Sequence, residues 1–210
     1  QKISAEIFVK KEYDDKNNQN HIFDNKTKKK IRIAYYSADF RNHPMSYLLA
    51  NLYELHDKNK FEVIGISFGP DKDDQMRKRV SSAFDKFYDL RLKTEEEIVK
   101  FSRELKIDIA IDLMCFTKYH KFGIFVKKCA PIQVNYLGYP GTSGTNYLDY
   151  IIADKILIPK DSQKYYSEKI VYLPDTYQAN DSTKKISDKI FTREALGLPK
   201  DGFVFCCFNN

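Results

Sequence analysis

Residues 31–44 read Ile-Arg-Ile-Ala-Tyr-Tyr-Ser-Ala-Asp-Phe-Arg-Asn-His-Pro, and this stretch decides the fold. Its first six residues are mostly β-branched, aromatic or apolar, which predicts a strand with a buried centre. Pro44 suits the first turn of a helix, and Asn42 or His43 can cap it, so a helix is expected from Pro44 to His56. A strand that runs through a polar loop into a helix is the repeating unit of parallel sheets.

The same alternation continues along the chain. Thr94 and Glu97 form a capping box, which marks the start of one further helix. Another helix and five more strands are predicted over residues 71–83, and over 61–68, 84–90, 107–113, 132–137 and 150–153. Strands and helices that alternate at this spacing indicate an α/β fold, a doubly wound parallel sheet covered on both faces. The sequence has no internal repeat.

The two ends of the chain differ from this pattern. Residues 1–29 are interpreted as a linker or as the end of an upstream helical region. Ile3 to Tyr13 is a short mixed segment, and the tract that follows is too rich in Asp, Lys, Asn and Gln to form a core. The doubly wound domain is assigned to residues 30–180, and residues 181–210 to a connection that leads onward.

That connection contains two predicted elements. Residues 192–196 suggest a short helix ended by Gly197, and residues 203–208 (Phe-Val-Phe-Cys-Cys-Phe) suggest a new buried strand. Because such a strand needs neighbours on both faces, we expect a second domain to follow Asn210.

Composition excludes several classes of partner. The formal net charge of +6 is mild, and the one dense basic run (Lys26, Lys28, Lys29 and Lys30) is interpreted as solvated, so no nucleic-acid partner is expected. No stretch approaches the roughly 20 apolar residues of a membrane span. The four cysteines lie in apolar runs without a CxxC pair, which favours buried thiols, no metal site and a cytoplasmic location.

Ligands of doubly wound domains bind beyond the carboxyl ends of the strands, so the loops there are the candidate sites. Asp39, Asn42 and His43 follow the first strand. The loop lacks the glycine-rich dinucleotide fingerprint, so no NAD or FAD is inferred. A neutral imidazole can accept a proton from an attacking hydroxyl. On composition alone, the three residues could equally serve only to cap the helix.

Two later loops have comparable features. Residues 137–144 carry three glycines and two hydroxyl side chains, which would let the backbone approach an anionic or sugar ligand, although a simple turn has the same composition. In residues 114–121, Thr117 and Lys118 could contact a phosphate or could merely be solvated.

Together these loops resemble a known family. The matching motifs stand in the same order as in the protein O-GlcNAc transferases, glycosyltransferase family 41, including its SPINDLY-like members. They are residues 33–44, 130–144, 149–154 and 166–169, and the resemblance extends over about residues 30–210.

The resemblance implies a GT-B fold of two Rossmann-like lobes facing a cleft, of which this chain supplies the N-terminal lobe. Members of the family, in which tetratricopeptide repeats often precede the catalytic region, transfer N-acetylglucosamine from UDP-GlcNAc to Ser or Thr hydroxyls of proteins. They invert the anomeric centre and need neither a metal nor a cofactor besides the donor. The groups that hold uridine diphosphate belong to the second lobe, so this chain alone is expected to be inactive.

The resemblance also implies roles for individual residues. His43 matches the residue proposed as proton acceptor in the family. The expected substrate- or donor-binding residues lie in the three loops and are Asp39, Asn42, Thr117, Tyr139, Pro140, Gly141, Thr142, Ser143 and Gly144.

One departure from the family keeps other hypotheses open. The chain reads Cys115-Phe116-Thr117 where bacterial relatives often read Gly-His-Thr and animal ones Gly-Tyr-Thr. Phe116 keeps an aromatic ring but cannot exchange a proton. The alternative is therefore a non-catalytic module that binds UDP-sugars or other proteins. A phosphoacceptor receiver domain is a weaker alternative, because the first strand does not end in the paired acids of a Mg²⁺ site.

Overall fold

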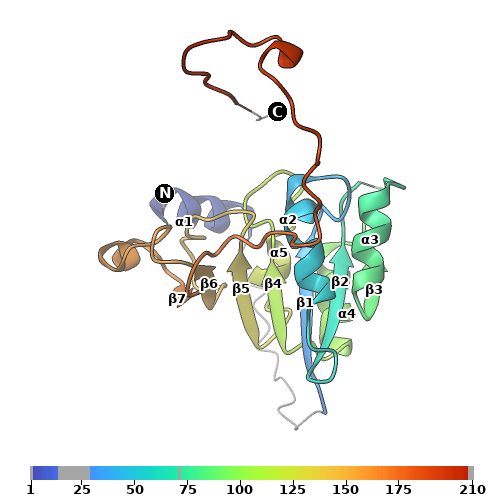
Figure 1. Ribbon diagram of the computed structural model, residues 1–210. Helices are drawn as coiled ribbons and strands as arrows, with labels where there is room; N and C mark the ends of the chain where they lie inside the picture. The colour runs from blue at the N-terminus through green and yellow to red at the C-terminus, as the bar shows by residue number, and fades with distance from the viewer. Residues whose placement is uncertain (1, 14–28, 71, 208–210) are drawn as a thin grey trace.

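The computed structural model describes residues 2–13, 29–70 and 72–207, and the structural statements below concern these residues. Their centre is one seven-stranded sheet in which every strand runs parallel to its neighbours (Figure 1). The strands are β1 (Ile31–Ser37), β2 (Phe61–Ser67), β3 (Lys86–Asp89), β4 (Ile109–Asp112), β5 (Ile132–Tyr136), β6 (Tyr150–Ala153) and β7 (Lys169–Tyr172). The predicted doubly wound α/β fold is confirmed.

The strand order changes direction at β1. The sheet runs β3-β2-β1-β4-β5-β6-β7, so the chain builds outward from β1 to β3 and then returns to the other side of β1. β1 pairs with β2 from Ile31 to Ser37 and with β4 from Ile33 to Tyr36. The point between β1 and β4 is the topological switch at which such sheets open a crevice for ligands.

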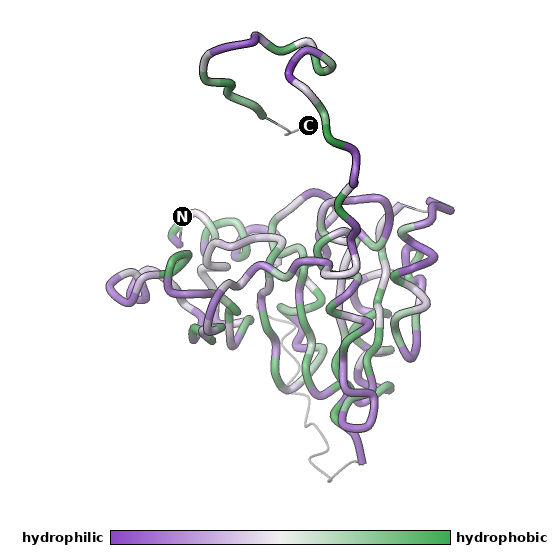
Figure 2. The backbone as a smooth tube through the Cα atoms, in the orientation of Figure 1, coloured by the Kyte–Doolittle hydropathy of each residue, from purple (hydrophilic) through white to green (hydrophobic). Residues whose placement is uncertain are grey.

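Helices cover both faces of the sheet (Figure 1). Leu49, Tyr53 and Val80, from α2 and α3, pack on one face with Ile33 and Tyr35 of β1. The opposite face is covered by α4 and α5, together with the N-terminal helix α1. The helices are α1 (Lys2–Glu12), α2 (Pro44–Glu54), α3 (Gln75–Ala83), α4 (Glu95–Glu104) and α5 (Gly123–Val126). Figure 2 shows the resulting pattern, with hydrophobic residues concentrated along the strands.

Local capping explains where the helices begin. His43 caps α2, and its ring nitrogen accepts a hydrogen bond from the backbone N–H of Met45. Thr94 and Glu97 form the predicted capping box of α4, with both reciprocal bonds present. The helix predicted from residue 71 begins at Gln75 instead, because the carboxylate of Asp74 caps it by accepting from the N–H of Arg77.

Three short elements were not predicted. α5 and β7 have only four residues each, too few for a clear hydrophobic period, and a 3₁₀ helix covers Lys160–Tyr165. β7 lies at the edge of the sheet and alternates between exposed and half-buried residues, so its sequence lacks the apolar run of an inner strand.

The strand predicted over residues 203–208 is wrong for the part that the structure describes. Residues 203–207 form no strand, and the side chains of Phe203 and Phe205 are 83% and 91% exposed. A strand needs a partner for its backbone groups, and this segment leaves the sheet without meeting one (Figure 1). The short helix before it is present as a 3₁₀ turn, Glu194–Leu196, and ends at Gly197 in the left-handed region.

The proposed division of the chain at residues 29–30 and 180–181 stays a prediction, and most of the expected linker (residues 14–28) lies outside the described residues. Contacts between described residues cross both positions. Ala5 and Val9 of α1 are buried against the domain. At the other end, Arg79 of α3 bridges Glu54 and Asp181.

Candidate active site

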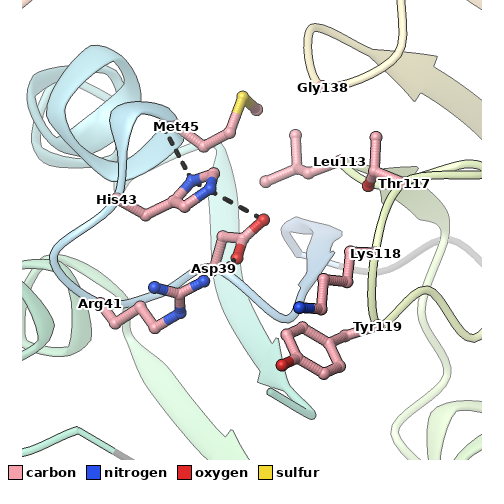
Figure 3. Close-up of a pocket in the computed structure, with 9 residues that line it drawn as sticks. All are labelled: Asp39, Arg41, His43, Met45, Leu113, Thr117, Lys118, Tyr119 and Gly138. Carbon is pink, nitrogen blue, oxygen red and sulfur yellow. Dashed lines mark hydrogen bonds and ion pairs between the residues drawn. The ribbon is translucent and has the colours of Figure 1, made fainter. Parts of the chain in front are cut away.

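A pocket of about 240 Å³ opens at the switch point, beyond the carboxyl ends of β1, β4 and β5 (Figure 3). Three loops contribute to it: residues 38–43 after β1, residues 113–119 after β4, and the start of the loop after β5. The lining residues are Asp39, Arg41, His43, Met45, Leu113, Thr117, Lys118, Tyr119 and Gly138.

The loop after β1 carries a carboxylate between a guanidinium and an imidazole. Asp39 is almost fully buried, and its Oδ1 accepts a hydrogen bond of 2.9 Å from Arg41. Its Oδ2 lies 3.7 Å from Nδ1 of His43, and Figure 3 shows the two groups turned toward each other. The backbone fixes this arrangement, because the Asp39 N–H donates to Ser37 Oγ and its carbonyl accepts from Ser46. The Asp39 carboxylate thus lies within ion-pair distance of the His43 ring.

The ring of His43 has two possible partners on the same nitrogen. Nδ1 accepts from the Met45 N–H at 3.3 Å, which requires Nδ1 to be unprotonated and puts the proton of a neutral ring on Nε2. If Nδ1 carries the proton instead, Asp39 is the nearby acceptor and Nε2 becomes free to take a proton. That second state is the one in which a carboxylate–histidine pair acts as a general base.

The electrostatics of the loop favour a neutral imidazole. Burial lowers the pKa of His43, Asp39 opposes that shift, and the positive charge of Arg41 adds to it. A histidine with a lowered pKa is unprotonated at neutral pH, as a proton acceptor must be.

The loop after β4 is folded by hydrogen bonds to its own backbone. Asp112 Oδ1 accepts from the N–H groups of Met114 and Cys115, and the Thr117 hydroxyl donates to the Met114 carbonyl. Lys118 is exposed at the pocket, with its amine 5.0 Å from the ring centre of Tyr119. Thr117 and Lys118 thus reach the pocket, and their contact with a phosphate stays a prediction.

Three of the five described non-glycine residues with positive φ lie at this edge of the sheet; the other two, Lys106 and Lys128, lie before β4 and β5. The φ values of Cys115, Tyr119 and Leu137 are 46°, 68° and 66°. They lie in the left-handed region, which residues other than glycine rarely adopt. All three belong to the loops after β4 and β5. Strained residues often cluster where a protein holds a ligand, so the strain supports the assignment of the pocket as the functional site.

Phe116, the departure from the family pattern, lies beside this pocket in an aromatic cluster. Its ring contacts Phe8 of α1, His120, Phe122 and Tyr139, with ring centres 4.9 to 6.2 Å apart. The Phe116 ring therefore packs α1 against the loops.

The loop after β5 meets the pocket only at its start. Gly138 lines the pocket and lies so close to the Leu113 carbonyl that an added Cβ would be 1.9 Å from that oxygen. Further on, Thr142 and Ser143 are buried, and both are bound by Glu168. The Glu168 carboxylate accepts from the Thr142 hydroxyl at 2.7 Å and from the Ser143 N–H at 2.6 Å. Glu168 thus joins two of the motifs that resemble the family, residues 130–144 and residues 166–169, by direct hydrogen bonds.

The structure brings together Asp39, His43 and Thr117 of the predicted site residues. Asn42 is exposed outside the pocket, and its N–H donates to Asp74. The members of the third loop other than Gly138 do not line the pocket: Tyr139 packs on Phe116, Gly144 lies against α1, and Pro140 is exposed. Their contact with a donor stays a prediction.

Sequence reasoning assigned no role to Arg41, Met45, Leu113 or Tyr119. Arg41 stood within the quoted first loop, and its charge two residues from Asp39 was the available signal. The other three give no signal, since an apolar or aromatic residue next to a strand end is indistinguishable from a core residue.

The described residues contain no group of three or more His, Cys, Asp or Glu side chains placed to hold a metal ion. None of the helices in residues 2–13, 29–70 and 72–207 has the length and apolar character needed to cross a membrane.

A protein-family model matches most of the chain. The model of the family described as "Glycosyl transferase family 41" matches residues 4–190, which covers the sheet and all three pocket loops. The chain belongs to glycosyltransferase family 41. The resemblance seen in the sequence motifs is thereby confirmed.

Relatives in family 41 show how much of a whole protein this chain represents. It is 37% identical over 186 residues to a probable UDP-N-acetylglucosamine–peptide N-acetylglucosaminyltransferase SEC of Arabidopsis thaliana, covering 86% of this chain and 19% of that protein. It is 31% identical over 180 residues to the enzyme with the corresponding name from Caenorhabditis elegans, covering 82% and 15%. The chain thus spans less than a fifth of the length of these relatives.

A solved structure confirms the fold. The chain superimposes on the Thermobaculum terrenum O-GlcNAc transferase mutant K341M with a TM-score of 0.78 and 29% sequence identity. The match covers 84% of this chain and 34% of that one.

Proposed function

We propose that this chain is the N-terminal lobe of an enzyme that transfers N-acetylglucosamine from UDP-GlcNAc to Ser or Thr hydroxyls of proteins. Family membership and the names of the relatives support the donor and the peptide acceptor. The single observation that carries the reaction is the Asp39–His43 pair, which lies in the pocket at the switch point of the sheet.

His43 is the proton acceptor in this proposal. The acceptor hydroxyl oxygen attacks C1 of the sugar while the bond between C1 and the phosphate oxygen breaks, and UDP leaves with the electron pair. The hydroxyl proton passes to Nε2 of His43, and Asp39 accepts a hydrogen bond from Nδ1–H and stabilises the positive charge that forms. Attack from the face opposite UDP inverts the anomeric centre.

In the whole protein, a second lobe that faces this pocket holds UDP. No metal or other cofactor takes part in the proposed reaction. A chelator is therefore expected to leave the rate of transfer unchanged. The protein acts in the cytoplasm, on protein acceptors, without membrane or nucleic-acid partners. The buried free thiols of Cys115 and Cys129 support a reducing compartment. Cys206 and Cys207 are exposed, against the expectation of four buried thiols.

Replacing His43 with Ala in the full-length protein tests the assignment. UDP release in the presence of an acceptor peptide is expected to fall by about 10²- to 10⁴-fold, the usual contribution of a general base. His56→Ala is a matched control, since His56 follows the other end of α2 and lies outside the pocket.

Near-normal turnover by the His43→Ala protein would rule out this role. If the wild-type protein binds UDP-GlcNAc but releases no UDP with any acceptor, the chain belongs to a non-catalytic UDP-sugar-binding module instead.

A further inference from the structure

Asp112 is a fully buried acid at the carboxyl end of β4, directly before the pocket residue Leu113. Its Oδ1 accepts two hydrogen bonds, from the N–H groups of Met114 at 2.9 Å and Cys115 at 3.1 Å. Its Oδ2 is buried and has no partner among the described residues. Half of this carboxyl group therefore holds the loop after β4, and the other half is unsatisfied.

Asn135 has the same incomplete pattern on the neighbouring strand. Its Nδ2 donates to the carbonyls of Tyr139 at 3.0 Å and Gly141 at 3.1 Å, which holds the loop after β5. Its Oδ1 is buried and, within the described chain, also has no partner. Asn135 is the register partner of Asp112 in the parallel pair β4–β5, so the two side chains lie side by side on one face of the sheet.

Two adjacent acceptors without a donor cost free energy, because each buried polar atom has lost its hydrogen bond to water. The nearby hydroxyl and thiol groups donate their hydrogen bonds to other acceptors. The hydroxyl of Tyr36, next to Asp112 on β1, donates to Ser102, and the thiol of Cys129 donates to Gln133. A proton on Asp112 would satisfy both oxygens at once, since a carboxylic acid has an O–H donor.

Burial, rather than a neighbouring charge, favours that proton. The titratable groups that face it are Tyr36 on β1, Tyr13 after α1, Cys115 in its own loop and Cys129 before β5. The negative charge of Glu168 helps to raise the pKa of the Cys115 thiol. None of these groups is a cation. Burial raises the pKa of Asp112 to about 7, against the two N–H bonds that lower it.

We propose that Asp112 is protonated in the working enzyme and donates a hydrogen bond from Oδ2 to Oδ1 of Asn135. This carboxyl–amide clip joins the two residues that hold the loops after β4 and β5. Those loops meet directly above it, where Gly138 lies against the Leu113 carbonyl at the pocket wall. Asp112 and Asn135 are positioning residues for the pocket; the clip itself does not depend on the proposed function, but its effect on the rate of transfer does.

The clip predicts a pH dependence opposite in sign to that of His43. Protonation of His43 removes the base at low pH, whereas ionisation of Asp112 opens the clip as the pH rises through about 7. If only the protonated form works, the rate at pH 8 is about tenfold below that at pH 6.

Asp112→Asn separates the charge from the hydrogen bonds. Its Oδ1 can still accept from Met114 and Cys115, and its amide replaces the O–H as donor to Asn135 without titrating. In the full-length protein, this variant is expected to keep the wild-type rate at pH 6 within about threefold and to lose the alkaline decline. Asp175→Asn, which changes an exposed acid, is expected to keep that decline.

Infrared spectroscopy tests the proton independently of activity. The wild-type protein at pH 6 is expected to show the C=O stretch of a buried protonated carboxyl group, which disappears in Asp112→Asn and fades in the wild type above pH 7. Absence of this band, or an unchanged alkaline decline in Asp112→Asn, would overturn the proposal. If the band is present in a protein that does not transfer sugar, the clip stands and the proposed function fails.

Discussion

Replacing Gly138 with Ala is expected to displace the loop after β5 from the end of β4. The new Cβ would lie 1.9 Å from the Leu113 carbonyl oxygen and 3.4 Å from Cε of Met45. Cβ atoms essentially never approach other heavy atoms closer than 3.0 Å, so the two segments must separate by roughly 1 Å. Leu113 is buried at the end of a central strand, and the loop is therefore the part that moves.

This displacement has two measurable consequences. Overpacking at a tight contact costs about 1–3 kcal/mol of unfolding free energy, which urea denaturation measures. A misplacement of about 1 Å in a catalytic pocket can lower the rate about 10²-fold, which the kcat for UDP release by the full-length protein measures. Gly138 does not have a positive φ, so the substitution tests the contact and adds no backbone strain.

Gly197→Ala is the control for this experiment. Gly197 has a φ of 67° and no neighbouring atom within 4 Å of an added Cβ, so its substitution costs about 1–2 kcal/mol in backbone strain alone and leaves the pocket intact. A Gly138→Ala enzyme with the wild-type kcat would refute the argument that contact between the two loops shapes the working pocket.

Two further predictions follow from the caps and charges. Because the positive charge of Arg41 lowers the pKa of His43, Arg41→Ala should raise it, and the acidic limb of the pH profile of kcat/KM should shift to higher pH; an unshifted limb would contradict the role of His43 as the base. Thr94→Ala removes the side-chain cap of α4 and should lower the free energy of unfolding by about 1 kcal/mol in urea denaturation, whereas Thr94→Ser should retain most of it.

The inner part of the sheet was predictable because its strands are apolar and alternate with capped helices. The side chains of β1 are buried from Ile33 onward, and Thr94 marks the start of α4 by local hydrogen bonds alone. β7 and α5 were not predicted, because a segment of four residues is too short to show a hydrophobic period. The apolar run at residues 203–208 misled because composition alone does not say whether a neighbour is present to pair with it.

The candidate site was predictable to a similar extent. Asp39, His43 and Thr117 follow adjacent strands of a parallel sheet, so their meeting at one edge follows from topology. The burial of Thr142 and Ser143 depends on Glu168, 25 residues further along the chain, and no local pattern reveals such a contact. No local pattern indicates that Asp112 and Asn135 become neighbours, because their register is set only when β4 and β5 pair.

The position of the pocket between β1 and β4 has a consequence for biosynthesis. Ile33 pairs with Ile109, so one wall of the pocket leaves the ribosome 76 residues before the strand that completes it. At roughly 5–20 residues per second, β1 waits about 4–15 s for this partner. β2 can pair with one edge of β1 once it has been synthesised, but the backbone groups of the other edge stay unpaired until β4 follows. The nascent chain therefore exposes the strand edge beside the future pocket, and an unpaired edge of this kind is a site for aggregation.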